Sequence, residues 1–287
     1  MALKSGANPK RFERSQIKFY IYLLPIAAFM LLPIIFIFNN AFKPLNEIFA
    51  YPPKFLVRQP TLENFQKLFS LSAGTAIPAT RYLFNSIVST VSVVTATIVI
   101  ASAAGYTLSK KKFLGKSFIF SLNTLALMFV PVAVAIPRFF IIKTLWLNNN
   151  FLAHIIPLLA MPVGLFLVKQ FIDQIPDALI EAAQIDGASD YYILIKLILP
   201  IIRPALATVA ILSFQTAWNS TEASQLFIDS SSIKNFAFYM STLSNTGSVA
   251  GAGVSAAATL IMFLPNLILF IILQSRVMNT LAHSGIK

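Results

Sequence analysis

Long stretches without charge constrain this chain more than any other feature of its sequence. Six stretches carry at most one Asp, Glu, Lys or Arg each, and each has about the length of a helix that crosses the roughly 30 Å hydrocarbon layer of a bilayer. Charged residues make up only 11% of the chain, against about 25% in a soluble domain. The sequence therefore predicts an all-α membrane protein with six transmembrane helices, at residues 19–38, 83–108, 117–137, 151–171, 201–218 and 252–273.

The distribution of lysine and arginine orients these predicted helices. Residues 1–18 and the loop at 109–116 hold nine basic residues within 26 positions, whereas the loops at 39–81, 138–150 and 219–250 hold eight within 88. Short loops rich in Lys and Arg stay in the cytoplasm. We therefore expect a cytoplasmic segment at 1–18, a six-helix domain at 19–273 and a cytoplasmic tail at 274–287. The same rule accounts for the net charge of +12 without any nucleic-acid partner.

Several kinds of chemistry are excluded by residues that the chain lacks or misplaces. The chain has no cysteine and its two histidines, His154 and His283, are far apart in sequence, so we expect no metal site and no catalytic residue. Gly115-Lys116-Ser117 resembles the end of a phosphate-binding loop, but Lys110 stands where that loop needs its first glycine. All ten Asp and Glu residues lie outside the predicted spans, whereas proton-coupled carriers place ionisable groups within the membrane. If the protein moves a solute, its energy is expected to come from another subunit.

The stretch between the fourth and fifth predicted spans, residues 175–204, combines charge, small residues and turn signals. Pro176 and Asp177 suit the first turn of a helix. Gly187 suits the left-handed position that ends a helix, and Ser189 suits the cap that begins the next one. The sequence therefore predicts a hairpin of two helices on the cytoplasmic side of the bundle.

The first helix of this hairpin presents a face of small residues. Ala182, Ala183 and Gly187 would let a partner's backbone come close, while Glu181 and Asp186 offer carboxylates to an Arg or Lys across the contact. The hairpin is thus a candidate docking site for another protein. An amphipathic hairpin that only ties the two spans together fits the composition equally well.

The same residues resemble the signature loop of permease subunits of binding-protein-dependent ABC importers. That loop reads Glu-Ala-Ala, three residues, Gly, nine residues, an aliphatic residue, one residue, and Leu-Pro. Here it reads Glu181-Ala182-Ala183, Gly187, Leu197 and Leu199-Pro200, with Asp186 before the glycine. The family usually has isoleucine where this chain has Leu197.

The resemblance extends over nearly the whole chain and points to the maltose-type, carbohydrate-importing branch. Its further carriers include Thr61-Leu62-Glu63-Asn64-Phe65, Phe84-Asn85-Ser86, Ala103-Ala104-Gly105-Tyr106, Ile136-Pro137, Phe166-Leu167, Trp218-Asn219 and the polar end Ser284-Gly285-Ile286-Lys287. The stretch from Ser220 to Phe238 departs from the branch, which often has a Pro-Leu-rich segment there.

The resemblance implies a complex of several proteins in a bacterial or archaeal cell membrane. It implies a second permease subunit, two ATPase subunits that bind ATP and Mg, and an extracytoplasmic solute-binding protein, with no cofactor and no catalysis in this chain. It places the contact with the ATPase at Glu181, Ala182, Ala183, Asp186, Gly187, Leu197 and Pro200.

Polar residues in or beside the predicted spans are candidates for the path of a solute. They are Asn85, Ser89, Asn123, Gln215, Trp218, Asn219 and Asn266. Each could instead form hydrogen bonds between helices, and a partner chain could make the main solute contacts. Two other functions stay open: an ABC permease for a glycerol phosphate diester or a peptide, and a secondary carrier or channel. A membrane enzyme is disfavoured because no nucleophile–base or metal constellation is present.

Overall fold

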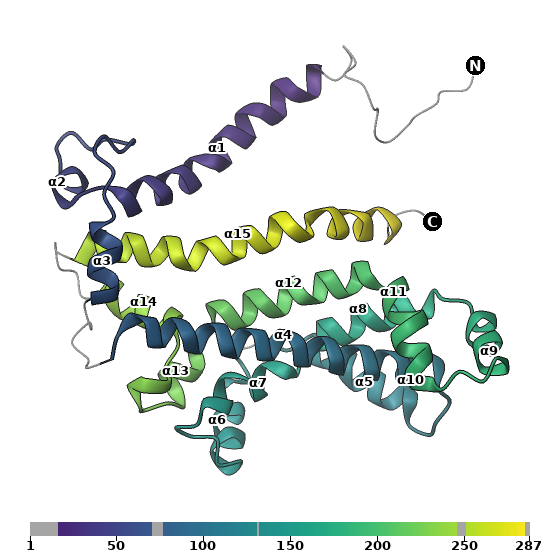
Figure 1. The fold of residues 1–287 in the computed structure, drawn as a ribbon. Helices are drawn as coiled ribbons and strands as arrows, with labels where there is room; N and C mark the ends of the chain where they lie inside the picture. Colours follow the sequence, from purple (N-terminus) through teal and green to yellow (C-terminus); the bar gives the residue numbers. More distant parts are fainter. Residues whose placement is uncertain (1–16, 71–76, 131, 246–250, 285–287) are drawn as a thin grey trace.

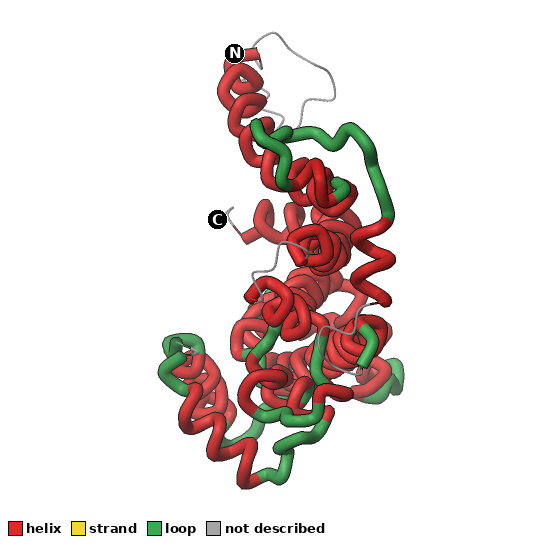
Figure 2. The backbone as a smooth tube through the Cα atoms, turned by 90° about the vertical axis from the view of Figure 1, so that its left-hand side faces the viewer, coloured by secondary structure: helices red, strands yellow, loops and turns green. Residues whose placement is uncertain are grey.

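The computed structural model describes residues 17–70, 77–130, 132–245 and 251–284. Every regular element in these ranges is helical, as the sequence predicts, and none of them is a strand (Figures 1 and 2). The longest elements are α1 (Ile17–Phe42), α4 (Ala79–Lys110) and α15 (Gly251–Ser284). The first two, together with residues 251–274 of α15, are each long and apolar enough to cross a membrane. They correspond to the first, second and sixth expected spans.

The fourth and fifth expected spans are bent. The fourth consists of η2 (Phe151–His154), α7 (Ile156–Leu159) and α8 (Pro162–Asp173), and its two halves meet at 43°. Pro162 begins α8 and has no amide hydrogen with which to continue α7. The fifth is α12 (Arg203–Asn219), which stands at 84° to the hairpin helix before it. The described residues thus contain three continuous candidate spans, or up to five if each bent pair is counted as one span.

The third expected span, at 117–137, differs from the prediction of one continuous helix. It consists of α5 (Lys116–Ala126) and the beginning of α6 (Ala135–Thr144), with turns between them. The 11 residues of α5 cover about 16 Å, roughly half of the hydrocarbon layer. Hydropathy averaged over the stretch does not register this break, because the turn residues are themselves apolar.

The centre of the bundle is α4, which packs against α8 and α12, while α12 also packs against α15 (Figure 1). Gly105 permits the close approach of α4 to α8, since a Cβ atom there would lie 2.8 Å from Val168 Cγ1. Small and hydroxylated residues fill the buried face of α4, as expected for helices that pack closely in lipid. This face includes Ser86, Ser89, Thr90, Thr97, Ala101, Ser102 and Gly105.

Helix α1 diverges from the bundle toward its N-terminal end (Figures 1 and 2). Its apolar side chains are largely exposed from Ile17 to Phe36, and it meets α15 near its other end, where the rings of Phe38 and Phe263 are 6.4 Å apart. Exposed apolar surface of this kind requires lipid or another chain around it.

Shorter helices gather at the two ends of the bundle. At one end lie α2 (Leu45–Ile48), α3 (Glu63–Ser70), α13 (Glu222–Leu226), η4 (Ser231–Ile233) and α14 (Phe236–Asn245). Asn64 of α3 donates through Nδ2 to the carbonyl oxygens of Ala41 and Lys43, at 3.0 and 2.7 Å, and so fixes α3 beside the end of α1. At the opposite end α9 (Asp177–Ile185) projects from the molecule (Figure 1).

Candidate functional site

The predicted hairpin is present, and its turn is fixed by backbone geometry. Helix α9 ends at Asp186, and Gly187 follows in the left-handed conformation with φ of 81°. The Gly187 amide donates to the Gln184 carbonyl at 3.0 Å, and the Ala188 amide donates to the Ala183 carbonyl at 2.9 Å. These two bonds form a Schellman motif, which favours glycine because a Cβ is disfavoured at that φ.

The second half of the hairpin also follows its sequence signals. Ser189 Oγ accepts from the Tyr192 amide at 3.3 Å and begins α10 (Asp190–Tyr192). A π-helical turn, η3 (Ile193–Ile198), and α11 (Leu199–Ile201) continue it. Ile193 and Ile198 are fully buried against α8 and the end of α4, and Leu197 is half-buried beside them. Pro200 is exposed.

The tip of the hairpin is exposed to solvent. Glu181, Ala182, Asp186 and Gly187 are all exposed, and Ile185 is 87% exposed. Neither Glu181 nor Asp186 has an ion-pair partner among the described residues. An open hollow beside the turn is lined by Ala183, Asp186, Gly187, Ala188, Ser189 and Tyr192. The tip is therefore a small, acidic and partly apolar surface that the described part of the chain leaves uncovered.

The end of α4 holds both halves of the hairpin. Lys110 Nζ lies 2.7 Å from Asp177 Oδ1 in the first turn of α9, and it also donates to the Ile175 carbonyl at 2.5 Å. The next residue, Lys111, pairs with Asp190 in the first turn of α10 at 2.5 Å. We call Lys110, Lys111, Asp177 and Asp190 the lysine clamp. The hydrogen bond from Lys110, followed by its charge, holds the pKa of Asp177 below its ordinary value of 3.8. The clamp ties the hairpin to the helix at the centre of the bundle.

The clamp was not predicted from the sequence, because the lysines of the loop at 109–116 were used only to orient the predicted transmembrane helices. A signal was available: acidic residues stand in the first turns of both hairpin helices, and a run of three lysines begins at the last residue of α4. The two ion pairs join residues that are separated by 67 and by 79 positions in the sequence. No short motif reveals pairing over such separations.

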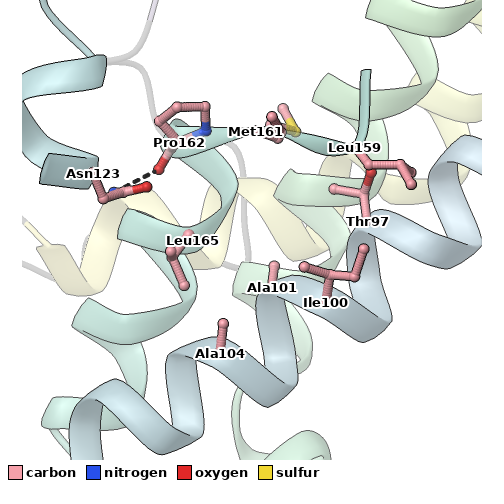
Figure 3. Close-up of a pocket in the computed structure, with 10 residues that line it drawn as sticks. Thr97, Ile100, Ala101, Ala104, Asn123, Leu159, Met161, Pro162 and Leu165 are labelled. Carbon is pink, nitrogen blue, oxygen red and sulfur yellow. Dashed lines mark hydrogen bonds between the residues drawn. The ribbon is translucent and has the colours of Figure 1, made fainter. Parts of the chain in front are cut away.

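Inside the bundle, a small hollow of 180 Å³ lies between α4, α5 and the break between α7 and α8 (Figure 3). Asn123 reaches across it from α5 and donates through Nδ2 to the Pro162 carbonyl at 3.2 Å. Thr97 on α4 is buried, and its Oγ1 has no hydrogen-bond partner among the described residues. The rest of the lining is apolar, including Ile100, Met161 and Leu165.

A larger hollow of 640 Å³ lies on the other side of the same break. It is bounded by the end of α5, by α6, and by the last turns of α12 with the start of α13. Gln215, Thr216 and Asn219 of α12 line it together with Arg138 and Glu222. We call this the outer hollow. Gln215 and Asn219 were predicted from the sequence as candidates for the solute path, whereas Arg138 and Glu222, which are 84 positions apart, were not.

The other candidates for the solute path have bonding roles inside the protein. Trp218 is 3% exposed, and its Nε1 donates to the Met262 carbonyl at 3.0 Å. Asn85 Nδ2 donates to the carbonyls of Ser232 and Lys234, at 2.9 and 2.8 Å. The remaining two bond within their own helices: Ser89 to the Ser86 carbonyl at 3.2 Å, and Asn266 to the Met262 carbonyl at 3.0 Å. Of the seven candidates, Asn123, Gln215 and Asn219 line hollows.

The described residues hold no group of three or more His, Cys, Asp or Glu that could bind a metal ion. Their arrangement offers two features: an exposed hairpin at one end, and hollows at a helix break in the interior. The exposed hairpin is the feature expected from the resemblance to permease subunits of ABC importers.

Comparison with known proteins agrees. Residues 97–275 match the family described as "Binding-protein-dependent transport system inner membrane component", and because this is more than half of the chain, the protein belongs to that family. Full-length relatives include the inner membrane ABC transporter permease protein YcjP of Escherichia coli, 27% identical over 95% of this chain and 97% of the relative. The arabinooligosaccharide transport permease AraQ of Halalkalibacterium halodurans is 28% identical over 93% of this chain and 94% of the relative.

Solved structures show the same fold. A bacterial ABC transporter involved in the import of the acidic polysaccharide alginate contains a chain that matches with a TM-score of 0.76 at 22% identity, covering 93% of this chain and 99% of that one. The resemblance seen in the Glu-Ala-Ala loop is thereby confirmed at the level of the family and the fold.

Proposed function

We propose that this chain is one of two permease subunits of an ATP-driven importer for a carbohydrate. Two separate ATPase subunits bind ATP and Mg, an extracytoplasmic solute-binding protein delivers the solute, and the complex lies in a bacterial or archaeal cell membrane. Family membership supports the assignment, and so do relatives named for the transport of arabinooligosaccharides and trehalose.

The exposed tip of the hairpin is the observation that carries the proposal. The signature residues Glu181, Ala182 and Gly187 lie on the surface and are not covered by any other described residue, although the backbone around them is tightly fixed. A surface that is ordered, small and acidic suits a cleft that carries a positive charge. We assign Glu181, Ala182, Ala183, Asp186 and Gly187 to contact with the ATPase, while Leu197 and Pro200 set the direction in which the second helix enters the bundle.

Six membrane crossings with both termini in the cytoplasm complete the proposal. The contacts between loops support this topology. The lysine clamp joins the end of α4 to the hairpin, so that both of these predicted cytoplasmic segments lie at the same end. At the other end, Arg138 pairs with Glu222 and Arg81 Nε donates to the Ser232 carbonyl at 3.2 Å, so three predicted outer loops meet. If the chain crosses the membrane twice between successive cytoplasmic segments, the clamp can form at the cytoplasmic end and the contacts of Arg138 and Arg81 can form at the outer end.

A secondary carrier is disfavoured, since α1, α4, α12 and α15 contain no Asp or Glu. The energy for moving a solute must then enter through the hairpin. A motion of the bound ATPase would pass through the lysine clamp to α4, against which α8 and α12 pack. The solute path is assigned to the hollows at the break between α7 and α8, with Asn123, Gln215 and Asn219 as lining residues.

The test is reconstitution of the complete transporter, isolated through a tag on this chain, in proteoliposomes. We expect uptake of an oligosaccharide that requires both ATP and the solute-binding protein. The chain purified alone should hydrolyse no ATP. Hydrolysis by the isolated chain, or uptake that persists without ATP but follows a proton gradient, would contradict the proposal.

A further inference from the structure

The outer hollow has an unusual charge distribution. Among the described residues that line it, only Arg138, from α6, and Glu222, from α13, are charged. Their side chains pair with Arg138 Nη2 at 2.5 Å from Glu222 Oε1, and each remains partly accessible, at 27% and 32%. The guanidinium is thus already matched by a carboxylate. The hollow as a whole carries no net charge.

The remaining polar groups of the outer hollow are amides and hydroxyls. Thr216 Oγ1 donates to the Leu212 carbonyl at 2.8 Å, and Asn219 Nδ2 donates to the Gln215 carbonyl at 2.9 Å, so the oxygens of both side chains keep free lone pairs. The Gln215 side chain is exposed and has no hydrogen bond with the described residues. Gln215 can therefore both donate and accept.

Apolar side chains complete the wall. Phe129, Pro157 and Met161 lie around the same hollow, and its volume of 640 Å³ is in the range of small-molecule sites. A sugar ring has the matching pattern, because its hydroxyls point outward around the rim while its C–H groups form apolar faces.

We propose that the outer hollow binds a neutral sugar unit through Arg138 and Glu222 acting together. The pair offers N–H donors beside a carboxylate acceptor, and two adjacent hydroxyls of one ring can accept from the first and donate to the second. Gln215 and Asn219 supply further bonds from α12. This inference rests on the proposed function and names the class of carbohydrate that the chain accepts.

Anionic solutes are disfavoured at the same place. A uronate carboxylate or a phosphate diester that approaches Arg138 must come close to the carboxylate of Glu222, and like charges repel strongly in a partly buried site. Glu222 is then a residue that determines specificity. A glycerol phosphate diester, the alternative solute considered above, would be repelled by the Glu222 carboxylate in the same way.

The experiment measures equilibrium binding of radiolabelled trisaccharides to the complete transporter in detergent, without its solute-binding protein. The probes are arabinotriose, maltotriose, galactotriose and trigalacturonate, of which the last two share a ring skeleton and differ in the carboxylate. We expect a neutral trisaccharide to bind at least about tenfold more tightly than trigalacturonate. Glu222→Gln should weaken the neutral probe about tenfold and strengthen trigalacturonate, because the guanidinium loses its partner.

Two further variants distinguish a loss of sugar binding from a failure of the protein to fold. Exchanging the charges, with Arg138→Glu and Glu222→Arg together, should restore the binding of the neutral probe to within about threefold of wild type. Lys143→Gln, which removes an exposed charge from the same helix, should change nothing. Preference of the wild type for trigalacturonate, binding of none of the four probes, or an unaltered preference in Glu222→Gln would overturn the inference. ATP-dependent uptake of a carbohydrate in proteoliposomes would still stand in each case, so the two proposals fail separately.

Discussion

The hairpin and the outer hollow, at opposite ends of α12, are built in different ways. The hairpin is fixed by bonds between close neighbours: the Gly187 turn closes on Gln184 and Ala183, and Ser189 caps the next helix. The outer hollow is enclosed by segments that are distant in sequence and joined by one ion pair, between Arg138 and Glu222. The 43° break between α7 and α8 lies at the hollow, whereas the continuous 32-residue helix α4 ends at the hairpin.

This difference fits the roles proposed for the two regions, contact with the ATPase for the hairpin and passage of the solute for the outer hollow. A surface that receives force from a partner must keep its shape, and local hydrogen bonds with a left-handed glycine give it that rigidity. A site through which a solute passes must rearrange, and helix breaks held by a few long-range contacts permit rearrangement at small cost. The lysine clamp connects the hairpin to α4, which lines the smaller hollow of 180 Å³ through Thr97 and Ala101.

The largest effect is expected from Gly187→Phe. The substitution places a bulky side chain at φ of 81° and on the surface assigned to the ATPase, so uptake in proteoliposomes should fall about tenfold or more while the protein still inserts. Gly115→Phe is the matched control, because Gly115 has φ of 87°, and neither glycine has a neighbour within 4 Å of its added Cβ. An equal loss of uptake in the two variants would mean that backbone strain alone causes it, and would contradict a specific role for Gly187 in contact with the ATPase.

Removing the lysine clamp should have the next largest effect. In Lys110→Ala with Lys111→Ala, uptake per ATP hydrolysed should fall about fivefold, because the hairpin loses both of its ion pairs to the end of α4. Lys112→Ala removes a neighbouring charge that forms no ion pair among the described residues and serves as control. An unchanged ratio of uptake to hydrolysis in the double variant would show that the hairpin does not act through α4.

A smaller effect is expected in the interior. Asn123→Leu removes the bond to the Pro162 carbonyl, worth about 1 kcal/mol, and should lower the unfolding temperature by about 2–4 °C. Thr124→Val provides the comparison, since Thr124 is exposed and bonds only within its own helix, to the Phe120 carbonyl. Equal shifts in both variants would mean that the Asn123 bond does not hold α5 to the helix break.

The smallest effect concerns pH. The pKa of Asp177 is lowered by Lys110, so its contribution is present above the ordinary value of 3.8 and is lost as the pH falls through the lowered pKa. Between pH 7 and pH 5 the ratio of uptake to ATP hydrolysis should therefore not change through the clamp. A loss of coupling in this interval that Asp177→Asn abolishes would contradict the assignment of the charges.

The sequence predicted the hairpin closely because its determinants are local. The helix start at Asp177, the left-handed Gly187 and the Ser189 cap all lie where their residue types indicated. The long spans were likewise predicted from apolar runs without charge, and α1, α4 and α15 agree with them.

The hollow and the third span could not be predicted in the same way. The turn residues between α5 and α6 are as apolar as the helices on either side. Hydropathy therefore predicted one helix where the structure has two. Trp218 was a candidate for the solute path because of its type, but only packing shows that it stacks on Phe214, with ring centroids 5.7 Å apart, and lies buried. Arg138 and Glu222 pair across 84 positions, a distance at which a single sequence carries no pairing signal.

The most direct measurement is cross-linking from single cysteines, for which this chain is well suited because it contains none. Ala182→Cys lies on the exposed tip of the hairpin, and Tyr51→Cys, at a residue 96% exposed, lies in a predicted outer loop and serves as control. In the complete transporter, a short thiol-to-amine cross-linker should join Ala182→Cys to the ATPase subunit and leave Tyr51→Cys unlinked to it. A link from Tyr51→Cys to the ATPase, or none from Ala182→Cys, would contradict the account.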